Sequence, residues 1–155
     1  MCIRDRAQRK CIMEGEKEIL KEWIVEYLKS KDAVTKQITA IKRDSENADV
    51  VIEGALKNKY VIVQPEFNDL SKLDFFKEKH VVIVTKNTRE NVEFLITHWD
   101  VLAKNPHLSI YFVNPESSLD KRWIIFPATH NRITEKKALR KGIESLYATV
   151  EPWKG

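Results

Sequence analysis

ADVVIEGALKNKYVIVQPEF, residues 48–67, is the stretch of sequence that decides the fold. It predicts two short, buried β-strands, residues 49–53 and 60–64, because β-branched residues are concentrated in both. Gly54 and Asn58 between them predict a hairpin with a longer loop. Pro65 ends the second strand, because proline has no N–H to donate to a β-ladder.

The remaining elements flank this hairpin on both sides. Apolar residues at helical spacing or in short β-branched runs predict helices at 16–29, 69–77, from Asn87 to Asn105 and from Thr134 onward, and strands at 34–42, 80–85, 108–113 and 123–126. Asn87 and Glu90 resemble a capping box. Three consecutive strands favour an antiparallel meander, whereas a strand–helix–strand unit favours a parallel crossover. We predict the α/β class: a mixed central sheet flanked by helices, in the order α-βββ-α-β-α-ββ-α.

Length and N-terminal sequence define the expected domain. A chain of 155 residues is most simply one domain, large enough to fold without disulfides or a structural metal. Its first letters, MCIRDR, resemble the translated adapter sequence found at the starts of proteins predicted from environmental DNA, and Met13 is a more natural start. We predict that residues 1–12 are a non-native or disordered segment and that residues 13–155 form a single α/β domain.

The cysteines and the hydropathy pattern exclude several classes. Cys2 and Cys11 are the only cysteines, which excludes a disulfide framework and a zinc site built on paired cysteines. No apolar run approaches the ~20 residues that cross a bilayer. The N-terminus lacks the apolar core of a signal peptide. These features predict a cytoplasmic protein without a membrane partner.

The overall charge is a weak guide to partners. The chain carries a formal net charge of +4 with a pI near 9.0, which is typical of nucleic-acid-binding proteins. Residues 1–12 contribute +3 of this charge, because four basic residues face one acidic residue, so residues 13–155 carry +1. Nucleic-acid binding by the body of the chain therefore requires basic residues to cluster on one face.

The strand ends of the central hairpin carry acidic and amide side chains. Asp49 opens the first strand, and Gln64-Pro65-Glu66 closes the second. Together with a preceding helix, a three-stranded meander, a helix and a further strand, this pattern resembles the restriction-endonuclease-like, PD-(D/E)xK nuclease superfamily. The likeness covers most of residues 16–113 in topology and about three residues in motif.

The resemblance implies a restriction-endonuclease-like fold, a magnesium cofactor and a nucleic-acid substrate. In that family an aspartate on the second strand and an acidic residue on the third bind magnesium, and a lysine two positions later orients or activates the attacking water. Asp49 stands at the first metal ligand, Gln64 where an acid is expected, and Glu66 where the lysine is expected. The implied catalytic set is therefore Asp49, Gln64 and Glu66, with Asp49 and Glu66 as magnesium ligands.

These departures leave the function open between several hypotheses. Two carboxylates around hydrated magnesium can still hydrolyse phosphodiesters, with Lys57 or Lys59 reaching back from the hairpin and a further acid, Glu18 or Glu22, from the first helix. Alternatively, the domain has lost the chemistry and is a non-catalytic or weakly active nucleic-acid-associated module. A third hypothesis is a protein-binding or assembly subunit, in a homodimer or with another partner, without magnesium.

The same residues also have an ordinary structural interpretation. An aspartate is common where a strand begins after a turn, and polar residues such as Gln64 and Glu66 are common at a strand end beside a proline. In that interpretation Asp49 has no metal to bind and the cofactor is none.

A second candidate site lies at PATHNRIT, residues 127–134, which we expect to be a loop leading into a helix capped by Thr134. Backbone amides at a helix N-terminus beside His130, Asn131 and Arg132 suit a phosphate or carboxylate. These three residues form the predicted anion-binding site. The alternative is a capping loop with solvated polar residues.

Other polar and aromatic residues favour structural roles. His98 and Asp100 flank Trp99 on a helix and point about 100° to either side of it, so they do not form a pair. His80 and His107 at strand starts are expected at the surface. The strand aromatics are expected in the core rather than stacking on bases: Tyr111, Phe112 and Trp123. The sequence contains neither a nucleophile elbow nor a glycine-rich phosphate loop.

Overall fold

A computed structural model describes the backbone of residues 2–45, 48–76, 79–118 and 120–153. Within these ranges it describes the side chains from Gly15 onward, apart from Ser45. The side chains of residues 1–12, predicted to be non-native or disordered, therefore lie outside the described residues.

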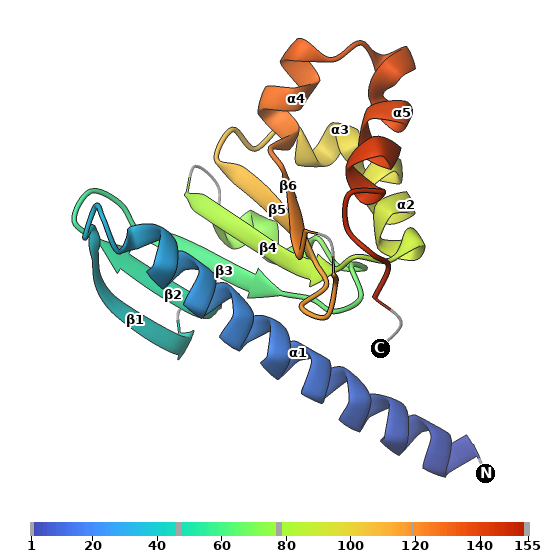
Figure 1. Ribbon diagram of the computed structural model, residues 1–155, viewed down its shortest axis with the longest axis horizontal. Coiled ribbons are helices and arrows are strands. Elements are labelled where there is room, and N and C mark those ends of the chain that lie inside the picture. Colours follow the sequence, from blue (N-terminus) through green and yellow to red (C-terminus); the bar gives the residue numbers. More distant parts are fainter. Residues whose placement is uncertain (1, 46–47, 77–78, 119, 154–155) are drawn as a thin grey trace.

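The described chain forms an α/β fold with a mixed sheet flanked by helices (Figure 1). Its elements are α1 (Cys2–Asp32), β1 (Ile38–Ser45), β2 (Ala48–Gly54), β3 (Lys59–Val63), the 3-10 helix η1 (Ser71–Phe76), β4 (His80–Lys86), α2 (Arg89–Thr97), α3 (Trp99–Leu102), β5 (Leu108–Val113), β6 (Arg122–Ile125), α4 (Pro127–Ile133) and α5 (Lys136–Tyr147). The fold class predicted from the sequence is confirmed, although the order of helices differs from the predicted one.

The six strands of the described residues follow one another across the sheet in sequence order, β1-β2-β3-β4-β5-β6. β1, β2 and β3 form the predicted antiparallel meander. β4 and β5 continue the sheet parallel to β3, and β6 returns antiparallel to β5. The carboxyl ends of β3, β4 and β5 consequently meet at one edge, close to the start of β2.

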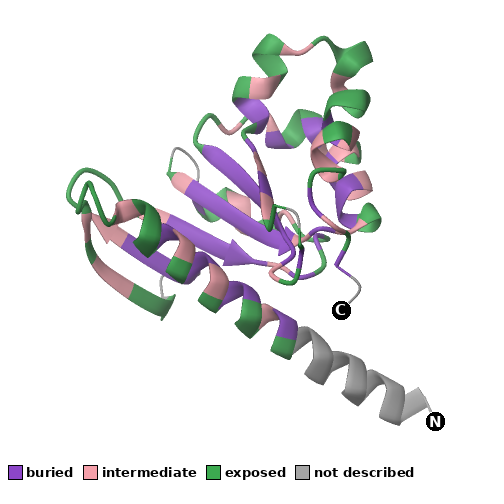
Figure 2. Ribbon diagram, viewed as in Figure 1, coloured by how far each residue is buried: buried purple, intermediate pink, exposed green. Residues whose placement is uncertain are grey.

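Each face of the sheet has its own apolar core (Figure 2). Alternate residues of β3 point to opposite faces: Tyr60 and Ile62 pack with α2, α3 and α5, whereas Val61 and Val63 pack with α1. Leu20 and Ile24 of α1 are fully buried in the core that contains Val61 and Val63, as their helical spacing predicts. Strands buried on both faces explain the apolar runs in the sequence.

The first strand is displaced from the predicted range of 34–42, because a turn intervenes after α1. The carboxylate of Asp32 accepts hydrogen bonds from the backbone N–H groups of Gln37 and Ile38, at 2.8 and 2.9 Å, and one from the hydroxyl of Thr35. Lys36 takes a positive φ of 49° in this turn. Side-chain capping by an aspartate thus outweighs the β-propensity of residues 34–37.

The helix predicted to run from Asn87 to Asn105 is broken into two. Its N-cap is Thr88, whose hydroxyl accepts a hydrogen bond from the backbone N–H of Asn91, so the predicted capping box is wrong by one residue. Asn87 is instead buried and bonded to Trp123 and to the chain after α5. α2 ends before His98, and α3 begins at Trp99. The short helix predicted at 69–77 is the 3-10 helix η1.

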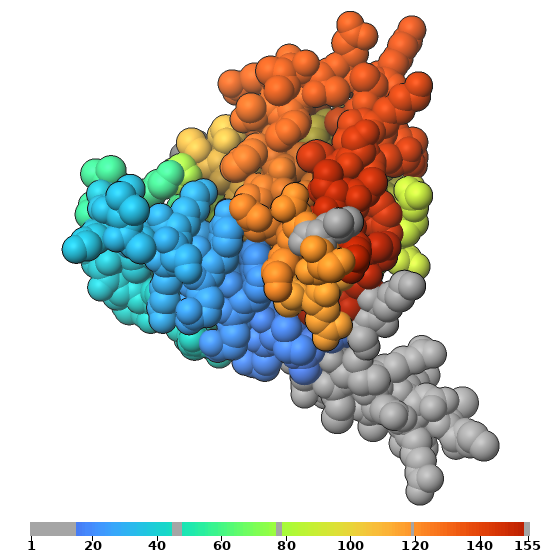
Figure 3. Space-filling view, in the orientation of Figure 1, coloured from blue at the N-terminus to red at the C-terminus, as the bar shows by residue number. Residues whose placement is uncertain are grey.

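The C-terminal part differs most from the prediction. Residues 127–133, expected to be a loop, form α4, which begins at Pro127, a residue favoured at the first helical position. Thr134 closes α4 instead of capping the final helix, and Glu135 precedes α5 without a side-chain capping bond. In the space-filling view, α1 in blue lies against the β6 region in orange (Figure 3). There the guanidinium of Arg122 lies 4.7 Å from the ring centre of Tyr27.

Candidate functional site

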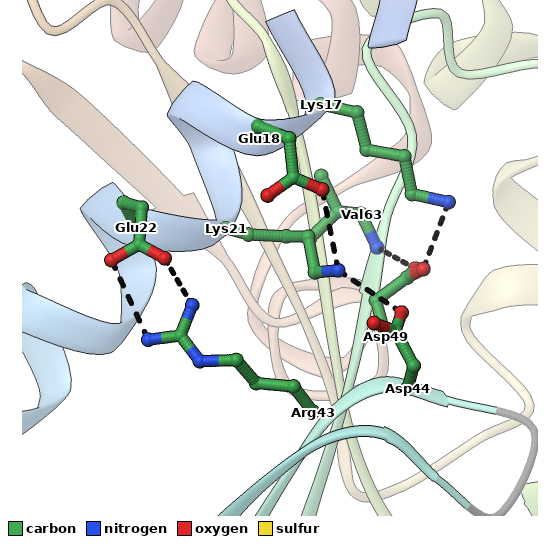
Figure 4. Close-up of polar contacts among 8 residues, drawn as sticks. All are labelled: Lys17, Glu18, Lys21, Glu22, Arg43, Asp44, Asp49 and Val63. Carbon is green, nitrogen blue, oxygen red and sulfur yellow. Dashed lines mark hydrogen bonds and ion pairs between the residues drawn. The ribbon is translucent and has the colours of Figure 1, made fainter. Parts of the chain in front are cut away.

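Asp49 is buried under α1, with an exposed fraction of 5% (Figure 4). Its carboxylate accepts a hydrogen bond of 2.7 Å from the backbone N–H of Val63 and forms an ion pair of 2.8 Å with Lys17 Nζ. The backbone pairing of β2 with β3 extends only to Val50 and Val61. Beyond the end of that pairing, the side chain of Asp49 therefore accepts the hydrogen bond from β3 and connects this strand to α1.

A row of charged contacts continues from Lys17 along α1 (Figure 4). Lys21 is buried and contacts Asp44 at 3.0 Å and Glu18 at 3.5 Å. Burial lowers the pKa of Lys21, but the hydrogen bond to Asp44 and the neighbouring carboxylates outweigh burial, so its pKa lies above the ordinary value. The same hydrogen bond lowers the pKa of Asp44. Glu18, a candidate for the extra acid, is thus engaged with Lys21.

Glu22, the other candidate acid, pairs with Arg43 of β1 through both carboxylate oxygens. The hydrogen bond from Arg43 is the main reason that the pKa of Glu22 lies below its ordinary value. Both acids of the first helix therefore face basic residues. Lys57 and Lys59, proposed to reach back, lie at the opposite end of β3 from Val63 and line a separate pocket.

Gln64 and Glu66 have surroundings different from that of Asp49. The amide of Gln64 donates to the carbonyl of Asp69 at 2.9 Å and accepts from its N–H at 3.4 Å. Glu66 is exposed to solvent. The carbonyl of Pro65, between them, accepts hydrogen bonds from Asn91 and Thr85, which fixes the turn after β3. Gln64 is thereby drawn toward the loop after Glu66.

A second ion pair, more deeply buried than that of Lys17 with Asp49, lies at the same edge of the sheet and was not predicted from the sequence. Lys86, the last residue of β4, contacts Glu16 of α1 at 2.6 Å, and its ammonium lies 5.8 Å from the ring centre of Trp153. A pocket of about 330 Å³ opens beside Lys86, with Glu66 and Asn91 in its wall. The acid-rich stretch EGEKE at 14–18, where the sequence predicted the helix to begin, is the only sequence signal for Glu16 and Lys17.

This donor set does not fit magnesium well. Magnesium in proteins is usually held by one or two carboxylates together with waters and substrate phosphates. Here the carboxylates of Asp49 and Glu16 each hold a lysine ammonium, so a magnesium ion would have to displace these cations. Within the part of the chain that the structure describes, no three His, Cys, Asp or Glu side chains gather as a metal cluster.

The three residues of the predicted anion site lie on α4, and two of them bond to different groups of the protein. The ring of His130 bonds to the backbone of Phe126, and Asn131 Oδ1 accepts a hydrogen bond of 3.0 Å from Trp99 Nε1. Arg132 is exposed to solvent. The expectation of a loop-borne site is therefore wrong in its local structure, because these residues are helical and two of them bond within the protein.

The other polar and aromatic residues largely have the expected roles. His98 bonds to the carbonyl of Phe94. The rings of His80 and His107 lie 4.3 Å apart, and His107 is exposed. All three strand aromatics are buried, as predicted for core residues: Tyr111, Phe112 and Trp123. Burial raises the pKa of Tyr111 to about 12.

Comparisons of the chain with protein-family models, with curated proteins and with solved structures gave no match. Among the helices of the described residues, none is long and apolar enough to cross a membrane. The site must therefore be interpreted from its own geometry.

If Asp49 is a structural anchor, replacing it destabilises the fold. Asp49→Ala leaves the N–H of Val63 and the ammonium of Lys17 without their acceptor, so we expect the free energy of unfolding to fall by about 2–4 kcal/mol. Asp49→Asn keeps an acceptor for Val63 and should lose roughly half as much. Urea denaturation followed by circular dichroism measures both.

Glu66→Ala is the matched control, because it removes the other predicted metal ligand from an exposed position. We expect its effect on the free energy of unfolding to stay within about 0.5 kcal/mol. An Asp49→Ala variant as stable as the wild type would contradict the anchoring role.

Proposed function

We propose that the chain is a nuclease-like α/β domain that associates with nucleic acid and does not cleave it. The observation that carries this proposal is the engaged carboxylate of Asp49, held by Lys17 at 2.8 Å and by the N–H of Val63 at 2.7 Å. The residue that resembles the first metal ligand of the PD-(D/E)xK superfamily is thereby used to attach α1 to the sheet.

The chemistry of phosphodiester cleavage supports a non-catalytic role. Magnesium-assisted hydrolysis requires carboxylates that are free to hold the ion, which generates the nucleophile and stabilises the developing charge. In this chain Asp49 is neutralised by Lys17, the amide of Gln64 is uncharged, and Glu66 is exposed to solvent. Of the two carboxylates that the resemblance implies as metal ligands, only that of Glu66 is left without a basic partner among the described residues.

A basic surface on α4 and α5 supports association with nucleic acid. Between Pro127 and Tyr147 the chain carries five basic and two acidic residues, a net charge of +3 with histidine neutral. Four of the basic side chains are exposed and form none of the ion pairs found among the described residues: Arg132, Lys136, Lys137 and Lys141. We call these four residues the α4–α5 basic surface. Exposed lysines and arginines bind phosphates by releasing condensed counterions.

The first test of this proposal is metal binding and cleavage. We expect the wild type to bind neither Mg²⁺ nor Mn²⁺ at millimolar concentration in titration calorimetry, because the ammonium of Lys17 is already paired with the carboxylate of Asp49. For the same reason we expect it to leave single- and double-stranded DNA and RNA intact. Metal binding and cleavage that are both lost in Asp49→Asn would overturn the proposal in favour of a magnesium-dependent nuclease.

The second test is nucleic-acid binding by the α4–α5 basic surface. We expect Lys136→Met/Lys141→Met to weaken binding of a fluorescent DNA duplex in an anisotropy assay, with little dependence on its sequence. If both lysines contact phosphates, the slope of log K against log salt should become shallower by about 1.8, at about 0.9 per contact.

The matched control is Lys31→Met/Lys57→Met, which removes the same charge from exposed positions elsewhere on the chain. If both double variants weaken binding equally, binding depends on the net charge of the chain and not on the α4–α5 basic surface. A wild type that binds neither DNA nor RNA would instead favour the protein-binding or assembly hypothesis.

A further inference from the structure

A pocket of about 250 Å³ lies at the other end of β3, between the end of α1, the start of β1 and the turn from β2 to β3 (Figure 1). Its apolar wall consists of Leu28, Ile38, Ile52 and Leu56. Leu28 and Ile52 are buried, whereas Leu56 is 88% exposed. Leu56 thus extends the apolar wall of the pocket to the surface, where the apolar part of a ligand can lie against it.

Three lysines give the same pocket a positive charge. Lys31, Lys57 and Lys59 line it, and none of them takes part in an ion pair found among the described residues. Asp32 also lines the pocket, but its carboxylate already accepts hydrogen bonds from the backbone N–H groups of Gln37 and Ile38. The pocket therefore combines an apolar wall with an excess of positive charge, three lysines against one aspartate.

The surroundings of Lys59 make its charged form less favourable than it is in water. Burial is the main cause that lowers the pKa of Lys59, and the positive charges of Lys57 and Lys31 lower it further, against a smaller opposing effect of Asp32. An anion in the pocket would offset this repulsion. The electrostatic environment thus agrees with what the shape and the lining residues indicate.

We propose that this pocket binds a small carboxylic acid with an apolar body about the size of one ring. An engineered cavity of about 150 Å³ holds benzene, so about 250 Å³ has room for a ring and a short acid-bearing arm. The ring would lie against Leu28, Ile52 and Leu56, and the carboxylate would face the ammonium groups of Lys31, Lys57 and Lys59.

This site is separate from the one proposed to bind nucleic acid. The pocket lies beside β1 and the turn from β2 to β3, whereas the α4–α5 basic surface lies at the far end of the molecule (Figure 1). Neither proposal depends on the other, because they use different lysines. Each double lysine variant therefore serves as the charge-matched control for the other site.

The test is a titration of the full chain with 3-phenylpropionate, followed by two-dimensional amide NMR. We expect saturable binding with a Kd of about 1 mM or tighter, and shifts concentrated at Ile52, Leu56 and Lys59. Lys31→Met/Lys57→Met should weaken binding at least about tenfold, because it removes two charged partners of the carboxylate at exposed positions. Lys136→Met/Lys141→Met should leave the affinity unchanged.

Two further probes separate the contributions of charge and apolar contact. 3-Phenylpropanamide, which lacks the charge, and inorganic phosphate, which lacks the ring, should each bind at least about tenfold more weakly than the acid. Equal affinity for either probe would overturn the proposal, as would the absence of saturable binding or shifts centred elsewhere. Retained affinity in Lys31→Met/Lys57→Met would overturn it as well.

Discussion

The contact of Asp49 with Lys17 and the N–H of Val63 is the interaction on which the arrangement of α1 and the sheet depends. A carboxylate that is 95% removed from solvent requires compensation, because burying an unpaired charge is very costly. Compensation comes from two elements distant in sequence, the middle of α1 and the end of β3. One side chain thus links α1 to the end of β3, beyond the point where the backbone pairing of β2 with β3 stops, and both of its carboxylate oxygens are engaged in doing so.

The sequence predicted the sheet well because its signals are local. Apolar β-branched runs such as HVVIVT at 80–85 and LSIYFV at 108–113 fit strands buried on both faces, and their bounds agree with β4 and β5 to within a residue. The predicted bounds were wrong where a side chain, and not a backbone carbonyl, accepts the hydrogen bonds of backbone N–H groups. Asp32 delays β1 by binding the N–H groups of Gln37 and Ile38, and Thr88 rather than Asn87 caps α2.

The candidate site was harder to predict because its contacts are long-range and charged. Asp49, Gln64 and Glu66 were selected from their positions at strand ends. Lys17, which pairs with Asp49, and Glu16, which pairs with Lys86, carry no periodic signal among the other charges of α1. Lys86 follows an apolar strand without distinguishing context, and Glu16 lies 70 positions away from it in sequence. Which lysine meets which carboxylate follows from the packing of α1 on the sheet, and that packing is set by apolar residues such as Leu20 and Ile24. The sequence therefore identified Asp49 from its position and missed Lys17, the cation that pairs with it.

A double-mutant cycle between Lys17 and Asp49 tests most directly whether this ion pair joins α1 to the sheet. The free energies of unfolding of the wild type, Lys17→Met, Asp49→Asn and the double variant give the coupling energy of the pair. The account predicts a favourable coupling of about 0.5–2 kcal/mol, reduced at high salt because the ammonium of Lys17 is partly exposed. Effects that add without coupling, within about 0.3 kcal/mol, would show that Lys17 does not stabilise the Asp49 carboxylate and would contradict the role of this pair in joining α1 to the sheet.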